Sequence, residues 1–349
     1  MTRASKTTDR AAAATSGETL LRVEGLRVDF NTFHGTIRAL SGINLALHRG
    51  AITGLAGETG CGKSVTAKAV LQLLPKTARI KAGRIFLEND DLLQKSESEM
   101  EDLRGRVIGM IFQNPRAALN PLFTVEQLLY FLLHRHEHLD RKKARKRSLS
   151  LLESVGIGAP MKRLRSYPFE LSTGMCQRVM IAMGLACEPK LLIADEPTTG
   201  LDVTIQAQVL ELLRQLVHGA GSTALLITHD LGVIAETSDY MGIMYAGRMV
   251  EFGGTDTIID SPLHPYTQGL LRSSFTGEDD DVLHYIPGVV PNLLHLPDGC
   301  TFAARCHARR AECETDVPNM VDCGGGHQVA CWLMEDVDPE ALGVKADNQ

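Results

Sequence analysis

The sequence predicts an α/β fold, on three observations. The first is the run GETGCGKS at residues 57–64, a glycine-rich loop that directly follows a short apolar run at 51–56. The second is a pair of short apolar runs, 191–193 and 224–228, that end in acidic or histidine residues. The third is the helical spacing of apolar residues from 123 to about 187. Short buried strands alternating with helices are typical of a sheet that binds ligands at the carboxyl ends of its strands.

The composition suits a large folded core. The chain has 349 residues, 44% of them hydrophobic, and a formal net charge of −6. The length favours an α/β core plus an appendage, and the acidic balance gives no general basic surface for nucleic acid. No apolar run approaches the roughly 18 residues that span a bilayer. Residues 1–18 lack the apolar segment of a secretory signal, so we expect a disordered leader there.

The remaining elements are predicted in chain order. Apolar runs between residues 20 and 48 alternate with turn residues, which indicates an antiparallel sheet. A helix is expected from Lys63 to Leu74, where a proline ends it. The basic run at 141–147 is interpreted as the solvated face of a helix, with a phosphate or lipid patch as the alternative. The last strands are expected within 240–253.

The run at 57–64 matches G-x-x-x-x-G-K-[ST], the loop that wraps nucleotide phosphates. Its glycines let backbone N–H groups point at a polyphosphate, and a helix that begins at Lys63 adds the positive end of its dipole. Lys63 is expected to reach the β- and γ-phosphates, and Ser64 to bind Mg²⁺. The alternative is a chance glycine-rich turn. The predicted ATP-binding residues of this loop are Gly57, Glu58, Thr59, Gly60, Cys61, Gly62, Lys63 and Ser64, and the role of Thr66 stays open.

Asp195 and Glu196 follow the apolar run at 191–194. Asp195 is placed to hold Mg²⁺ through its water shell. Two adjacent carboxylates beside a polyphosphate repel one another unless a metal neutralises one, so Glu196 is expected to accept a proton from an attacking water. The alternative is a strand-end pair that caps a helix.

The segment LSTGMCQR at 171–178 resembles the L-S-G-G-Q signature of ATP-binding-cassette (ABC) proteins. The phosphate loop, Gln113, this signature, the Asp195-Glu196 pair, the run at 200–202 and His229 follow one another in the family's order. The resemblance therefore covers most of the chain. It implies a P-loop NTPase core of the RecA type, an antiparallel β subdomain, and an α-helical signature subdomain at about 114–187. It also implies roles for Gln113 as the Q-loop glutamine at Mg²⁺, Asp202 as the D-loop aspartate, His229 as the switch histidine at the γ-phosphate, and Phe30, with Phe33 as second choice, as the ring that stacks on adenine. A core position is the alternative for Phe30.

In that family two ATPase subunits pair head to tail, and each ATP lies between the phosphate loop of one subunit and the signature of the other. The resemblance therefore implies that Ser172, Thr173, Gly174 and Met175 contact the partner's ATP, at a helix N-terminus that favours an anion. The chain departs from the family at Thr173, where glycine is usual, and at Met175, where glutamine is usual. A β-branched residue at such a close approach is expected to weaken the partner's ATP site.

Three carboxyl-terminal runs resemble the extension of one group within the family, the oligopeptide, dipeptide and nickel importer ATPases. They are HPYT at 264–267, IPGVVP at 286–291 and PDGCTFAARC at 297–306. The resemblance implies an ATP-hydrolysing importer subunit for peptides or similar solutes, on the cytoplasmic face of the inner membrane. Its partners would be a second ABC ATPase subunit, two permeases and an extracytoplasmic solute-binding protein, with no nucleic acid. The predicted boundaries are a leader at 1–18, a nucleotide-binding domain at 19–262 and the extension at 263–349.

Two other classes stay open. One is a non-transport cassette protein of DNA repair or translation, but such proteins carry fused cassettes, coiled coils or zinc inserts. The other is an inactive cassette, which the presence of Lys63, Glu196 and His229 disfavours.

Five of the eight cysteines lie after residue 299. A cytosolic chain does not use a disulfide framework, so this clustering suggests thiolate ligation of a soft metal. The resemblance implies a four-iron four-sulfur cluster on Cys300, Cys306, Cys313 and Cys331, with zinc or plain reduced cysteines as alternatives and Cys323 free. Since these residues lie outside the nucleotide motifs, loss of a cluster is expected to leave nucleotide binding at Lys63 intact.

Overall fold

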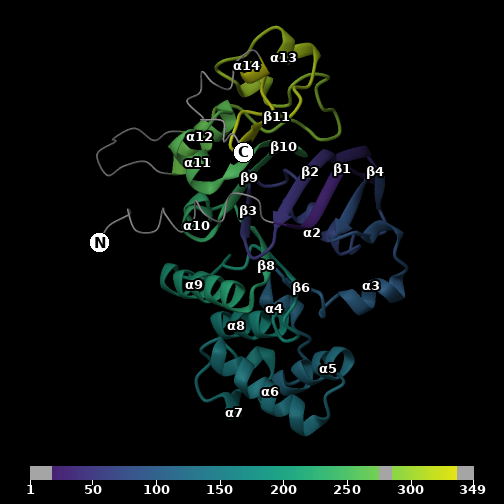
Figure 1. The fold of residues 1–349 in the computed structure, drawn as a ribbon, viewed down its shortest axis with the longest axis vertical. Coiled ribbons are helices and arrows are strands. Elements are labelled where there is room, and N and C mark those ends of the chain that lie inside the picture. Colours follow the sequence, from purple (N-terminus) through teal and green to yellow (C-terminus); the bar gives the residue numbers. More distant parts are fainter. Residues whose placement is uncertain (1–17, 275–284, 336–349) are drawn as a thin grey trace. The chain divides into compact units, whose positions relative to one another are not determined.

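The computed structural model describes residues 18–274 and 285–335 (Figure 1). Residues 1–17 of the predicted leader lie outside this description. The chain divides into two compact units. The first takes in Met1–Ala46, Thr53–Leu93 and Thr228–Gln349, and the second takes in Leu47–Ile52 and Gln94–Ile227.

The first unit contains the antiparallel sheet that was predicted, with strands in the order β2-β1-β4-β5. Figure 1 labels β2, β1 and β4 of this sheet. The strands are β1 (Thr19–Thr32), β2 (Gly35–His48), β4 (Ala78–Leu87) and β5 (Asp90–Asp91). In the pairing of β1 with β4, Leu21 lies opposite Leu87. Leu21 and Val23 are buried while Arg22 between them is exposed, because successive side chains of a strand point to opposite faces.

A second set of strands in this unit surrounds β3 (Ile52–Ala56), whose five residues are all buried. β3 runs parallel to β9 (Tyr240–Tyr245), and β9 runs antiparallel to β10 (Arg248–Gly254). The hairpin of β11 (Val321–Asp322) and β12 (Gln328–Val329) adds to β10. The prediction that the last strands lie within 240–253 is therefore wrong, because strands of two residues carry no detectable alternation of polarity.

The helices of the first unit are mostly short. They are α2 (Lys63–Val70), α10 (Leu231–Thr237), α11 (Thr255–Asp260), α12 (Pro265–Ser274), α13 (Glu312–Thr315) and α14 (Trp332–Glu335), with 3₁₀ turns at η2 (Leu92–Gln94) and η4 (Ala303–Arg305). α2 begins where predicted but ends four residues early. Gln72 has a φ of 51°, a left-handed conformation that ends a helix, and its side-chain amide donates to the Leu92 carbonyl.

The second unit contains three parallel strands in the order β8-β7-β6: β6 (Ile108–Ile111), β7 (Leu191–Asp195) and β8 (Thr223–Ile227). All residues of β7 and β8 are buried. The helices are α3 (Glu97–Leu103), α4 (Pro115–Ala118), α5 (Val125–Glu137), α6 (Arg141–Ser154), α7 (Pro160–Arg163), the 3₁₀ turn η3 (Pro168–Glu170), α8 (Thr173–Gly184) and α9 (Val203–Ala220). The helical character predicted for 123–187 is confirmed.

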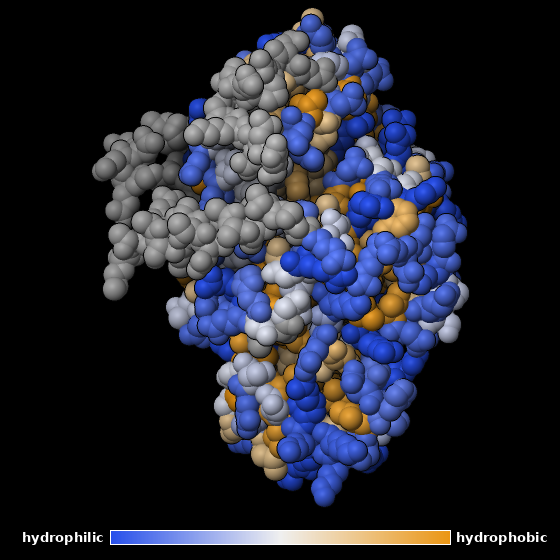
Figure 2. Space-filling model, viewed as in Figure 1, coloured by the Kyte–Doolittle hydropathy of each residue, from blue (hydrophilic) through white to orange (hydrophobic). Residues whose placement is uncertain are grey.

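The basic run at 141–147 lies on α6, as expected for a solvated helix face. Arg141, Lys142, Lys143 and Lys146 are exposed, whereas Ala144 is buried. The surface over α5 and α6 is largely hydrophilic in Figure 2. Among the described helices, none combines the length and apolar character needed to cross a membrane.

Glu251 of β10 is a fully buried charge that joins three segments of the first unit. Its carboxylate accepts hydrogen bonds from the backbone N–H groups of Leu263 (2.8 Å) and His264 (3.0 Å), and it lies 2.7 Å from Nε2 of His327. Glu251 is 0% exposed and His327 is 4% exposed. A buried carboxylate is tolerated only when such partners surround it.

Replacing Glu251 by alanine is expected to destabilise the first unit by about 3 kcal/mol, because it leaves buried donors without an acceptor. Denaturant unfolding measures this change. Glu314→Ala is the matched control, since the Glu314 side chain is 61% exposed and its ion pair with Arg309, at 3.5 Å, lies on the surface. Equal stability of the two variants would contradict the assigned role of Glu251.

Candidate functional site

The glycine-rich loop packs so closely against its surroundings that two of its glycines cannot be replaced without a clash. A Cβ on Gly57 would lie 2.1 Å from the Met244 carbonyl oxygen, and one on Gly62 would lie 2.6 Å from Cδ2 of Leu40. Both residues also have a positive φ, of 142° and 109°. Glycine is the residue that tolerates both conditions.

Lys63 follows the last glycine of this loop and is 6% exposed. Its ammonium donates to the Gly57 carbonyl (2.6 Å) and the Glu58 carbonyl (3.2 Å), and it lies 3.6 Å from Sγ of Cys61. Burial raises the pKa of the Cys61 thiol, an effect that Lys63 partly offsets. Since carbonyl oxygens are weaker partners for an ammonium than phosphate oxygens, an anion entering the loop could draw Lys63 away from them.

The N-cap of α2 is Gly62, which has no side chain to accept from the N–H groups of the first turn. Ser64 is half-buried in this turn. The Thr66 hydroxyl donates to the Gly62 carbonyl (3.1 Å), which gives this buried residue a local structural role.

His229 lies near the strand that leads into the loop. The residue before it, Thr228, donates from its backbone N–H to the Leu55 carbonyl of β3 (3.3 Å). His229 itself is exposed and precedes α10, whose N-cap Asp230 accepts from the Val233 N–H (3.2 Å). The structure therefore brings Lys63, Ser64 and His229 to the carboxyl end of β3, within one unit.

In the second unit the structure joins Gln113 and Glu196. The Gln113 amide donates to Oε2 of Glu196 (2.7 Å), and the Thr199 hydroxyl donates to the same oxygen (2.9 Å). Glu196 has a φ of 46°, a conformation that is uncommon for a residue with a side chain. Asp195, the last residue of β7, is 4% exposed. Sequence reasoning missed Thr199, although its place three residues after Glu196 is a signal for a local hydrogen bond.

The signature segment and the D-loop both form helix N-termini in this unit. Oγ of Ser172 accepts from the Met175 N–H (3.3 Å) at the start of α8, where Thr173 and Gly174 form the first turn. Asp202 caps α9 in the same way, through Ile205 N–H (2.9 Å). These caps are local structural roles beside the functional roles that the sequence predicts.

The two candidate adenine-stacking rings differ in exposure. Phe30 is half-buried in β1 opposite Ala78. Phe33 is 100% exposed, in the turn between β1 and β2, with its ring edge-on to His34 at a centroid distance of 5.6 Å. A stacking platform needs an exposed face, which Phe33 has.

The four carboxyl-terminal cysteines of the predicted cluster line one small cavity, of about 10 Å³. They are Cys300, Cys306, Cys313 and Cys331. Burial raises the pKa of the Cys331 thiol to about 11, and burial also raises the pKa values of Cys300 and Cys306. Among the described residues, no group of three or more His, Cys, Asp or Glu side chains is arranged to hold a metal ion. Cys323 is buried with Val329, next to Cys331.

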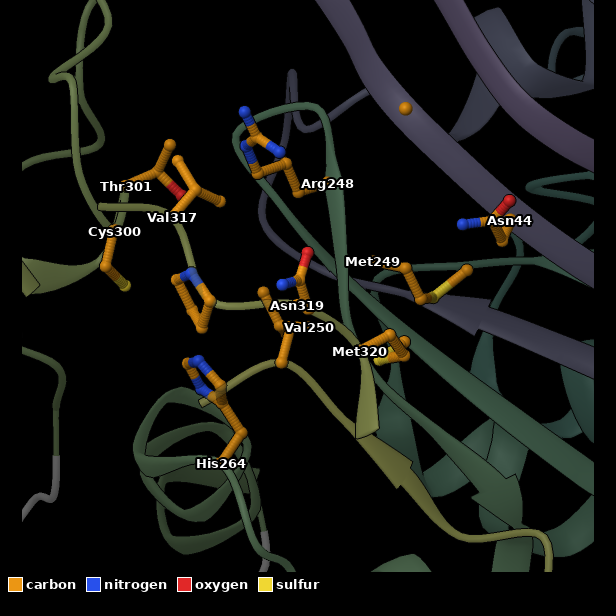
Figure 3. Close-up of a pocket in the computed structure, with 13 residues that line it drawn as sticks. Asn44, Arg248, Met249, Val250, His264, Cys300, Thr301, Val317, Asn319 and Met320 are labelled. Atoms are coloured by element: carbon orange, nitrogen blue, oxygen red, sulfur yellow. The ribbon is translucent and has the colours of Figure 1, made fainter. Parts of the chain in front are cut away.

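A second and larger cavity, of about 140 Å³, adjoins the cysteines (Figure 3). Cys300 and His264 line both cavities, and Arg248, Asn44 and Asn319 lie on the other walls of the larger one. Burial lowers the pKa of His264 to about 4, so its imidazole is neutral at pH 7.

The carboxyl-terminal extension reaches the phosphate loop, which the sequence did not predict. Arg305 pairs with the Glu58 carboxylate, and the Tyr266 hydroxyl accepts from the Glu58 N–H (2.9 Å). Arg305 directly precedes Cys306, so this contact lies beside the predicted cluster. That loss of a cluster leaves nucleotide binding at Lys63 intact stays a prediction.

Two regions of this chain match family models of known proteins. The family model "ABC transporter" matches residues 40–199, and the model "Oligopeptide/dipeptide transporter, C-terminal region" matches residues 250–313. The chain is 46% identical over 323 residues to the dipeptide transport ATP-binding protein DppD of Bacillus subtilis, covering 91% of this chain and 96% of that protein. It is 45% identical over 325 residues to the oligopeptide transport ATP-binding protein OppD of the same organism, covering 92% and 90%.

Solved structures show the same fold. The ATP-binding cassette MJ0796, in a dimeric post-hydrolysis state bound to ADP and Pi, matches with a TM-score of 0.62 at 24% identity, covering 67% of this chain and 98% of that one. The cbiO1 protein of Clostridium perfringens, part of the transporter complex cbiONQ, matches with a TM-score of 0.60 at 30% identity, covering 70% and 92%.

Proposed function

Because this chain belongs to the family of ABC transporter ATP-binding proteins that carry the oligopeptide/dipeptide transporter C-terminal region, we propose that it powers an importer. It hydrolyses ATP to drive the uptake of peptides or similar solutes, of the dipeptide, oligopeptide or nickel class, through separate permeases. The observation that carries the proposal is the phosphate loop, whose glycines pack against Met244 and Leu40 and whose lysine is buried inside it. Similarity to peptide transport proteins along 91% of the chain supports the solute class.

Nucleotide binding is assigned to residues 57–64 of the first unit. Backbone N–H groups of the loop and of the first turn of α2 bind the phosphates, and Lys63 leaves the Gly57 and Glu58 carbonyls to reach them. Adenine stacks on Phe30 or Phe33, of which the exposed ring of Phe33 is the better platform.

Magnesium fits the oxygen donors that the chain offers, namely the Ser64 hydroxyl, the Gln113 amide and the Asp195 carboxylate. When bound with ATP, the ion neutralises charge on the phosphates. Glu196 accepts a proton from the attacking water, and Gln113 and Thr199 hold its carboxylate in one orientation. His229 contacts the γ-phosphate. Gln113, Glu196 and His229 are thus the proposed catalytic residues.

Pairing with a second ABC ATPase subunit, identical or different, supplies the other face of each ATP site. At the start of α8, the signature residues face the partner's γ-phosphate; they are Ser172, Thr173, Gly174 and Met175. The Ser172 hydroxyl accepts from the Met175 N–H but can still donate its own hydrogen to that phosphate. Asp202 forms the D-loop. Two permeases and an extracytoplasmic solute-binding protein complete the importer. The chain is peripheral, on the cytoplasmic face of the inner membrane. The proposed domains are 19–262 for nucleotide binding, with signature helices at about 114–187, and 263–349 for the extension.

The four carboxyl-terminal cysteines are proposed to hold a four-iron four-sulfur cluster, for which four thiolates are the required ligands. Their convergence on one cavity supports this. Among the described residues the thiols do not form a metal-binding group as they lie, and the cavity of about 10 Å³ has room for about one water molecule. The segments that carry the cysteines therefore have to move apart, with the sulfurs still facing inward, to admit a cluster. The adjoining cavity of about 140 Å³ provides space for that movement.

Glu196→Gln is expected to lower ATP turnover by ~10²–10⁴-fold, because the amide keeps the shape of the side chain but cannot accept the proton. Nucleotide binding should persist, and peptide uptake by the assembled complex should stop. Lys63→Ala is the contrasting variant, in which binding and turnover fall together. Turnover of Glu196→Gln near the wild-type rate would show that another group is the base.

Thr173→Gly is expected to raise ATP turnover of the assembled complex, since glycine allows closer approach of the α8 N-terminus to the partner's γ-phosphate. Steady-state hydrolysis measures this. An unchanged or lower rate would show that the threonine is compatible with the site.

Anaerobically purified protein is expected to be brown and to contain about four iron atoms per chain. Serine at Cys300, Cys306, Cys313 or Cys331 should remove the colour, whereas the control Cys323→Ser should keep it. Elemental analysis of iron and zinc per chain distinguishes the cluster from a zinc site. Stoichiometric zinc without iron would replace the cluster by a tetrathiolate zinc site.

A further inference from the structure

We propose that Arg305 and Tyr266 of the carboxyl-terminal region are positioning residues for the ATP site, which act by holding Glu58 of the phosphate loop. The proposal rests on the nucleotide site assigned to that loop. It adds a function for the extension, which is to set the affinity of the loop for ATP.

Glu58 is the residue through which the loop is organised. Its backbone N–H donates to the Tyr266 hydroxyl (2.9 Å), and its carbonyl accepts from the Lys63 ammonium (3.2 Å) and the Cys61 N–H (3.2 Å). Its carboxylate receives both terminal nitrogens of Arg305, at 2.8 and 3.0 Å. A displacement of Glu58 would therefore move the start of the loop and the lysine together.

Arg305 is itself immobilised. Each of its five N–H groups can be matched with an acceptor. Nη1 donates to Glu58 and to the Tyr245 hydroxyl (3.3 Å). Nη2 donates to Glu58 and to the Ile286 carbonyl (3.2 Å), and Nε donates to the Pro287 carbonyl (2.9 Å). Five is the full donor capacity of a guanidinium. The Arg305 side chain is 6% exposed and the Glu58 side chain is 26% exposed, so solvent screens this pair only in part.

The platform beneath this pair is aromatic and buried. Tyr245, Tyr266 and Phe302 are mutually in contact, with ring centroids 4.6 to 5.3 Å apart. The Arg305 guanidinium lies 5.7 Å from the Tyr245 ring and 5.9 Å from the Phe302 ring. These rings share one core with Ala56, the last residue of β3 before the loop. The extension thus forms part of the support of the loop.

The charge of Glu58 explains why this support matters for ATP. A carboxylate on a loop that receives a triphosphate repels its ligand, and an opposite charge held at hydrogen-bond distance offsets that repulsion. The bidentate geometry also fixes the direction of the side chain. Arg305 therefore has two effects on the loop, neutralisation and orientation.

The test is calorimetric titration of the full chain with MgATP. Arg305→Gln is expected to raise the Kd about tenfold, a change within the range for a hydrogen bond between charged groups. Adding Glu58→Gln to that variant should restore most of the affinity, because the unpaired carboxylate is then gone. Tyr266→Phe, which keeps the ring, should raise the Kd about threefold. The control Arg309→Gln removes an equal charge from an exposed side chain of the same extension and should change nothing.

A merely structural role predicts a different pattern. If Arg305 only stabilised the extension, Glu58→Gln would not rescue the Arg305→Gln variant, and the thermal midpoint would fall without a selective change in Kd. The proposal instead predicts that Arg305→Gln raises the KM for ATP of the assembled complex while kcat at saturating ATP stays nearly constant. Absence of the rescue, or an unchanged Kd in both Arg305→Gln and Tyr266→Phe, overturns the proposal. If instead Lys63→Ala leaves the Kd unchanged, the nucleotide site itself is wrongly assigned.

Discussion

Close packing around the phosphate loop is the constraint on which the rest of the first unit depends. The backbone of β9 passes so near Gly57 that a single methyl group would meet the Met244 carbonyl at 2.1 Å. β2 confines Gly62 in the same way through Ala39 and Leu40. The path of the loop is therefore fixed by the surrounding strands before a ligand arrives. Fixed backbone donors lose little freedom on binding, which is why such a loop can hold an anion tightly.

The parts of this arrangement that the sequence could predict are those determined by neighbouring residues. β3, β7 and β8 are completely buried, so each appears as a short, mainly apolar run rather than an alternating one. The start of α2 follows from the glycine and lysine of the loop itself. The helical region at 123–187 has the apolar spacing that one buried face requires.

The parts that could not be predicted depend on residues far apart in the chain. Glu58 and Arg305 are separated by 247 positions, and each by itself looks like a solvated charge. The two-residue strands β11 and β12 exist because β10 offers an edge, which no local pattern encodes. The early end of α2 results from a single left-handed residue, Gln72. In each case tertiary contacts, and not local propensity, select the structure.

Glu196 shows how the second unit organises its share of the proposed site. A φ of 46° costs on the order of 1–3 kcal/mol for a residue with a side chain. The Glu196 N–H bond to the Ile227 carbonyl (2.8 Å) and the donors from Gln113 and Thr199 offset that cost. These bonds hold the carboxylate at the end of β7 in one orientation. These contacts are in place before the nucleotide binds. The first unit holds Lys63 differently, by bonds to the Gly57 and Glu58 carbonyls of its own loop, which the ammonium exchanges for phosphate oxygens when the nucleotide binds.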